Sequence, residues 1–150
     1  MGQRGLAILL DVERLRTVLR WTLAAIYLTA GVFHLYSTDA FVRIVPDWVP
    51  APRLTVIATG CCELVGAVAL VTTRLRWLAG LLLALYAVCV YPADIKHAIG
   101  GIAIGGNRLG WGYHAPRLAF QPVLVWWALF SGHVIDWPFR ERLRKRAHTQ

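Results

Sequence analysis

The chain has 150 residues, of which 57% are hydrophobic and 16% are charged, and its net charge at pH 7 is +8. Soluble domains usually carry about 25% charged residues, and a hydrophobic content this high excludes a disordered tail. The basic residues stand in bursts between long uncharged stretches, which argues against a nucleic-acid clamp and indicates a membrane protein.

The sequence predicts an all-α fold, a four-helix transmembrane bundle that forms one domain over residues 1–150. Residues 1–17 alternate leucines with charges and are expected to lie along the inner membrane interface. Four nearly uncharged stretches follow, each long enough to cross a hydrocarbon layer of ~30 Å. They predict spans at about residues 18–38, 54–73, 76–95 and 118–136. Residues 137–150 are expected to form a basic cytoplasmic tail.

The distribution of Lys and Arg predicts that both termini are cytoplasmic. Eleven of these residues belong to the terminal segments and the connection after the second span, and five belong to the other two connections. The more basic side of a membrane protein normally faces the cytoplasm. The basic excess therefore indicates a lipid bilayer as partner, and no nucleic acid is needed to explain it.

The two outer connections have different compositions. Residues 39–53 contain three prolines, which interrupt a helix, together with Trp48 and aliphatic residues that favour the interface. We expect a short interfacial segment folded against the bundle. Residues 100–116 are rich in glycine, but no predicted strand precedes them, so they do not match a phosphate-binding fingerprint. We expect a mobile loop there.

Glu63 is the only fully charged residue inside the nearly uncharged stretches themselves, residues 21–38, 54–73, 77–93 and 118–135, and ionisable groups within a span are candidates for function. Small residues flank Glu63 and also His34 on their helical faces, so both side chains are expected to point into the bundle. The rise of ~1.5 Å per residue places them at similar depths, which predicts a contact between them. The alternative is that the pair only holds two helices together. The protonation of Glu63 is left open.

Four further polar residues are expected at the outer mouth. Asp94 and His97 share a face at the end of the third span, and Arg117 and Gln121 share a face at the start of the fourth. An ion pair between Asp94 and Arg117 would tie the two helices together. With His34 and Glu63, these side chains predict a polar pocket that opens outward, although Asp94, Arg117 and Gln121 could be purely structural.

No sequence motif identifies a cofactor or a catalytic reaction. The chain has no C-x-x-C, and the His and Glu residues lack the spacing of a metal site, so no metal is expected. Whether the protein is an enzyme is therefore left open, and so is a homo-oligomeric state.

Five short motifs follow one another along the chain: GVFH at 31–34, IVPDWVP at 44–50, TG and ELVGA within 59–67, YPADIKHA at 91–98, and QPVL with a later WA within 121–128. They resemble the DoxX-like family of small bacterial membrane proteins, over a range from about Leu28 to Trp127. The resemblance implies a four-helix bundle in the bacterial cytoplasmic (inner) membrane. The chain departs from the family in Asp94, where Asn is common, in His97 and in the long glycine-rich loop.

The resemblance implies a link to redox or stress functions, because the family takes its name from a thiosulfate:quinone oxidoreductase system. A shared fold does not by itself transfer chemistry. The first hypothesis is an accessory or scaffold subunit of a membrane redox system, with an oxidoreductase partner and a pocket that binds quinone or another small lipophile. The alternatives are a lipid- or partner-binding assembly protein and, less favoured, a small proton-coupled transporter, since the chain lacks duplicated halves.

Overall fold

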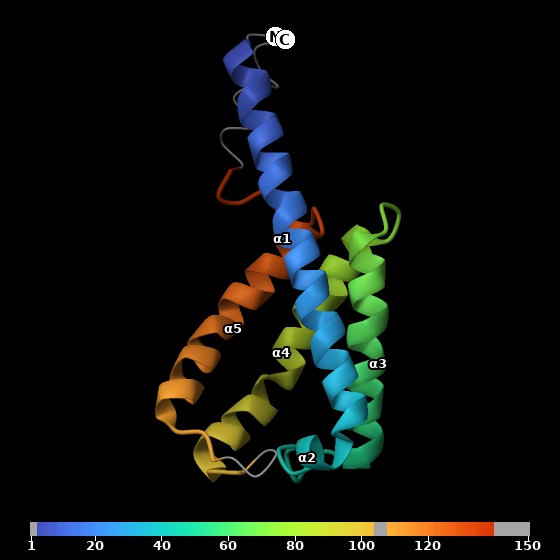
Figure 1. The fold of residues 1–150 in the computed structure, drawn as a ribbon, viewed down its shortest axis with the longest axis vertical. Helices are drawn as coiled ribbons and strands as arrows, with labels where there is room; N and C mark the ends of the chain where they lie inside the picture. Colours follow the sequence, from blue (N-terminus) through green and yellow to red (C-terminus); the bar gives the residue numbers. More distant parts are fainter. Residues whose placement is uncertain (1–2, 104–107, 140–150) are drawn as a thin grey trace.

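A computed structural model describes residues 3–103 and 108–139, and within these residues the chain is helical and has no strand. It forms five helices: α1 (Gln3–Tyr36), α2 (Thr38–Val42), α3 (Pro52–Val71), α4 (Arg76–Gly100) and α5 (Trp111–Ser131). The four long helices run up and down in turn, so the start of α1 and the end of α5 lie at the same end of the molecule (Figure 1).

Three segments, Leu9–Tyr36, Pro52–Val71 and Arg76–Gly100, are long and apolar enough to cross a membrane. They bear large apolar side chains on their outer faces, such as Val65 and Leu82, which are more than half exposed. Water would disfavour such faces, whereas lipid accommodates them. The chain is therefore a multi-pass membrane protein. Helix α5 is not one of these three segments.

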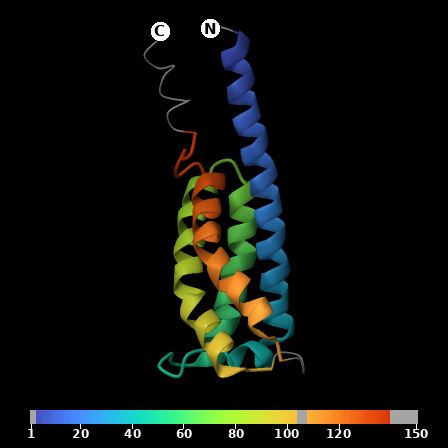
Figure 2. The same ribbon diagram turned by 90° about the vertical axis from the view of Figure 1, so that its left-hand side faces the viewer.

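The long helices pack as two pairs, α1 with α3 and α4 with α5. The pairs lie close together near the end of α5 and separate toward α2, as the ribbon shows (Figure 1). The N-terminal part of α1 extends past the other helices (Figure 2). Leu23, Leu70 and Ala128 are fully buried where the pairs meet, and they join the helices into one core.

Glycines allow the closest approaches between helices. A Cβ added to Gly31 of α1 would lie 2.8 Å from the Gly60 carbonyl oxygen of α3. A Cβ added to Gly80 of α4 would lie 2.7 Å from the Cα of Gly132, just after α5. Such contacts are too short for any side chain, so these glycines fix the spacing of α1 against α3 and of α4 against the end of α5.

The helix boundaries differ from the expected ones at several places, and the short helix α2 lies in the stretch expected to be an interfacial segment. Residues 3–17 do not form a separate segment but continue directly into α1, since neither Gly nor Pro interrupts the chain from Leu6 to Trp21. Helix α4 continues to Gly100. Helix α5 begins at Trp111, within the stretch expected to be a loop, and includes Pro116, which removes only one helical hydrogen bond there.

The other boundary expectations are met only in part or lie outside the described residues. Helix α5 ends at Ser131, and the chain then turns through residues 132–139. The rest of the expected basic tail, residues 140–150, and residues 104–107 of the glycine-rich stretch lie outside the part of the chain that the structure describes.

Candidate functional site

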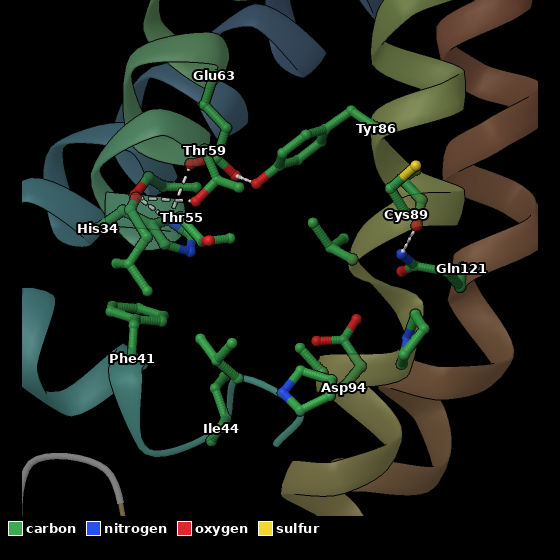
Figure 3. Close-up of a pocket in the computed structure, with 18 of the residues that line it drawn as sticks. His34, Phe41, Ile44, Thr55, Thr59, Glu63, Tyr86, Cys89, Asp94 and Gln121 are labelled. Atoms are coloured by element: carbon green, nitrogen blue, oxygen red, sulfur yellow. Dashed lines mark hydrogen bonds and ion pairs between the residues drawn. The ribbon is translucent and has the colours of Figure 1, made fainter. Parts of the chain in front are cut away.

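A cavity of about 520 Å³ lies between the α1–α3 pair and the α4–α5 pair. The side chains that line it come from every helix and from residues 44–49, and most are apolar. Polar side chains lie on two opposite sides of the cavity. His34 and Glu63 lie on the α1–α3 side, and Asp94 and Gln121 face them from the α4–α5 side (Figure 3).

Glu63 is the most buried carboxylate in the described chain, with 4% of its surface exposed. The hydroxyl of Tyr86 in α4 donates a hydrogen bond of 2.7 Å to Glu63 Oε1 across the cavity (Figure 3). On the other side, His34 Nδ1 lies 2.8 Å from Glu63 Oε2. The carboxylate therefore connects α3 to both α1 and α4.

The contact between His34 and Glu63 is close but poorly aligned. His34 Nδ1 also lies 3.0 Å from the carbonyl oxygen of Ala30, and its N–H is directed at that carbonyl. Glu63 Oε2 is consequently buried without a hydrogen-bond donor among the described residues. An unpaired buried carboxylate oxygen is costly, and such groups occur at sites that hold a proton or a ligand.

Two contacts hold the imidazole of His34, the Ala30 carbonyl and the ring of Phe41. Its ring stacks on that of Phe41, with a distance of 4.1 Å between ring centroids and an angle of 28°. Since Phe41 belongs to the short helix α2, the position of His34 depends on how α2 folds under the bundle.

Asp94 and Arg117 form the second polar group. Arg117 Nη2 donates to Asp94 Oδ1, and this ion pair joins α4 to α5. Arg117 Nη1 donates to His97 Nδ1 at 3.2 Å, while His97 Nε2 donates to the Ile102 carbonyl at 3.1 Å. Both ring nitrogens of a neutral His97 ring are therefore used, and the bond to its Nδ1 helps to hold the Arg117 guanidinium in place.

Gln121 lies between the two polar groups. Its side-chain amide donates a hydrogen bond of 2.6 Å to the carbonyl oxygen of Ala87 in α4. Pro92, which lies inside α4 and lines the cavity, lacks the N–H that would bond to the preceding turn. Helix α4 thus lacks the hydrogen bond from residue 92 to the Val88 carbonyl beside the cavity, and Gln121 of α5 donates to the carbonyl one residue before it.

Residues 44–49 cover the cavity at the α2 end. Ile44 and Val45 are buried against the bundle, as expected for a segment folded onto it. Lys96 of α4 holds the segment by donating to the Val45 carbonyl at 2.6 Å and to Asp47 Oδ1 at 2.7 Å. These residues therefore form an apolar wall at the α2 end of the cavity, and Lys96 fastens that wall to α4.

The structure brings five of the six residues predicted for the pocket to the cavity wall: His34, Glu63, Asp94, Arg117 and Gln121. The sixth, His97, does not line the cavity. It lies behind Arg117 with 1% of its surface exposed, and its ring packs edge-on against His114.

Tyr86 and Lys96 were not among the residues predicted for the site. Tyr86 is the donor to Glu63, yet a tyrosine in an apolar span gives no signal beyond its amphipathic character. Lys96 was counted only as a loop charge. No group of His, Cys, Asp and Glu that could hold a metal ion occurs among the described residues.

Comparison with known proteins gives one match. The family described as a domain of unknown function (DUF8561) matches residues 23–131, which include α3, α4 and α5, the last part of α1 and every polar residue that lines the cavity. No curated protein and no solved structure matches the chain.

Proposed function

The chain belongs to the DUF8561 family, and from this premise we propose that it is a DoxX-like four-helix transmembrane protein that binds a quinone or a similar lipophile in its central cavity. It would serve as an accessory or scaffold subunit of a redox system in the bacterial inner membrane, with both termini in the cytoplasm. The buried carboxyl of Glu63 in the wall of an apolar cavity is the observation that carries the proposal.

The packing of α5 supports the assignment of a fourth span. This helix has 21 residues and only one fully charged side chain, Arg117, whose charge is paired with Asp94. A helix of this length is about 30 Å long, which matches the hydrocarbon layer. Because the ion pair removes most of the cost of burying a charge, α5 can cross beside α4. An even number of spans also agrees with the excess of Lys and Arg at the terminal side.

The size and chemistry of the cavity suit a lipophile with a small polar headgroup. Ligand sites commonly have volumes of about 300–1,000 Å³ and combine apolar walls with a few polar groups. Here the apolar walls would hold the ring and tail, while Gln121 and Arg117 have further N–H groups that could donate to carbonyl oxygens. Either a ligand hydroxyl or a proton on the carboxyl would satisfy Glu63 Oε2.

A quinone would use this arrangement for proton exchange. Its reduction requires protons as well as electrons, and the Glu63–His34 pair can hold and pass a proton next to the headgroup. The electrons would come from an oxidoreductase partner, which is why we propose an accessory role.

The test is native mass spectrometry of the protein solubilised gently from its own membranes, with identification of the molecules that stay bound. We expect the wild-type chain to retain a quinone or related lipophile and the Glu63→Gln variant to retain at least tenfold less. Asp39→Asn is the matched control, because it makes the same carboxylate-to-amide change at a side chain that is 82% exposed.

Other outcomes would replace the proposal. Retention of a phospholipid alone, dependent on Glu63, would favour a lipid-binding assembly protein. If neither wild type nor Glu63→Gln retained a bound molecule, Glu63 would only hold helices together, and the redox role would then be abandoned.

A further inference from the structure

A second group of charged side chains lies at the end of the bundle opposite α2, where α1 passes the turn that follows α5 (Figure 2). Arg16 and Arg20 of α1 are 2% and 5% exposed, although each carries a full charge. Arg76, at the start of α4, is half-buried, and its backbone oxygen lies against Gly132. We call Arg16, Arg20 and Arg76 the arginine cluster.

The charge of Arg16 is balanced within the chain. Its Nη2 donates to Asp136 Oδ1 at 2.8 Å, and Glu13 Oε1 lies 3.6 Å from its Nη1. Its guanidinium also stacks on the ring of Phe130, 4.5 Å from the centroid. Two carboxylates and an aromatic face thus surround this arginine, as buried charges require.

Arg20 and Arg76 have no such balance. Arg20 donates to the Ser131 carbonyl at 3.0 Å, and its Nη2 lies 2.8 Å from His133 Nε2, so neither of these partners is a carboxylate. Burial and the neighbouring arginines lower the pKa of His133, which keeps its ring neutral at pH 7. Within residues 3–103 and 108–139, no carboxylate forms an ion pair with Arg20 or Arg76.

Unused hydrogen-bonding atoms gather at the same place. Arg16 Nε, Arg76 Nε and Ser131 Oγ are all buried without a partner among the residues that the structure describes. They make up three of the four buried side-chain atoms left without a partner there, and all three can donate. His133 also has a positive φ of 61°, a conformation that a non-glycine residue adopts only when its surroundings impose it. A cluster that is rich in donors and in excess positive charge attracts an anion.

Exposed tryptophans indicate where this end lies in the membrane. Trp21, Trp77 and Trp137 are each more than half exposed, and they are next to Arg20, Arg76 and Asp136 in the sequence. Indole rings concentrate at the level of the lipid headgroups. The arginine cluster is therefore at the depth of lipid phosphates.

We propose that the arginine cluster is a binding site for the phosphate of an anionic phospholipid. Arg76, the least buried of the three, contacts the phosphate, and Arg20 behind it supplies the unbalanced charge. A guanidinium binds phosphate through two parallel hydrogen bonds, so Arg suits this role better than Lys. The site depends only on the protein being embedded in a membrane, and it is independent of the ligand of the central cavity.

The experiment measures binding of phosphatidylglycerol and of phosphatidylcholine to the delipidated full-length protein in mild detergent, by native mass spectrometry. We expect phosphatidylglycerol to bind at least tenfold more tightly. Arg76→Gln is expected to lower the affinity for phosphatidylglycerol about fivefold. This is the equivalent of ~1 kcal/mol for one basic side chain at an anionic surface. Arg74→Gln is the control, since it removes the same charge from an exposed position two residues away.

Three results would overturn the proposal. Equal affinity for the two lipids would show that the cluster does not select an anion. An equal loss in Arg74→Gln and Arg76→Gln would show only general attraction between charges. Displacement of the lipid by millimolar inorganic phosphate would assign the site to free phosphate instead. Arg76→Lys, which keeps the charge, provides a second variant if Arg76→Gln fails to fold, and it should bind phosphatidylglycerol more weakly than wild type but more tightly than phosphatidylcholine.

Discussion

The ion pair between Asp94 and Arg117 should respond unequally to removal of its two partners, because the two side chains are buried to different degrees. The side chain of Asp94 is 8% exposed, whereas that of Arg117 is 32% exposed. Arg117→Gln leaves a buried carboxylate without its counter-charge and also removes the donor to His97. Breaking a buried pair in this way costs about 3 kcal/mol or more.

Asp94→Asn should lower the free energy of unfolding much less, by about 1 kcal/mol, because the amide still accepts a hydrogen bond and Arg117 can turn toward water. The double variant Asp94→Asn/Arg117→Gln should be more stable than Arg117→Gln alone, since it no longer buries an unpaired charge. The expected order of stability is therefore wild type, Asp94→Asn, the double variant and then Arg117→Gln.

The assay is thermal unfolding in mild detergent, followed by tryptophan fluorescence at about pH 7. A loss of ~3 kcal/mol corresponds to a fall in Tm of roughly 6–12 °C for a chain of this size. Two results would contradict the expected order: an Arg117→Gln protein no less stable than Asp94→Asn, or no recovery of stability in the double variant. Either result would mean that water already solvates Asp94.

Three further predictions concern single contacts. Tyr86→Phe removes the donor to Glu63 and should lower retention of the bound lipophile in native mass spectra severalfold, whereas unchanged retention would place the ligand elsewhere. Gly80→Ala should cost about 1–3 kcal/mol in thermal unfolding, because its Cβ would meet backbone 2.7 Å away, while Gly112→Ala, with open space around it, should cost nothing. The pKa of His133 is lowered in the folded protein mainly by burial, so the unfolded chain binds the proton more readily. Stability should therefore fall as the pH drops below about 6.5, and His133→Gln should flatten that dependence in Tm measured against pH.

The cavity and the arginine cluster are at opposite ends of the bundle and can be separated experimentally. Glu63→Gln changes the cavity and leaves the arginine cluster intact, and Arg76→Gln does the reverse. A lipid that depends on Arg76 but not on Glu63 would support the arginine cluster alone. A lipophile that depends on Glu63 but not on Arg76 would support the cavity alone.

Local properties of the sequence were sufficient to predict the helices and the direction in which the buried polar residues point. Apolar length predicts helices able to cross a membrane, and small neighbours predict that Glu63 and His34 face inward. Spacing of three residues placed Asp94 on the same face as His97. These inferences depend only on helical geometry, which repeats in the same way along every helix.

Only the tertiary structure shows which side chains meet, because the rotation and spacing of neighbouring helices depend on packing between them. The close approaches at Gly31 and Gly80 set α1 against α3 and α4 against the end of α5, and the contact of Gly66 with Leu83 lies between α3 and α4, the helices that Glu63 and Tyr86 join. Chain positions more than a hundred residues apart also come together, as when Arg20 meets the turn after α5. The periodicity of a single helix contains no information about such contacts. Sequence therefore determined the kind of protein and most residues of its pocket, and packing determined their partners.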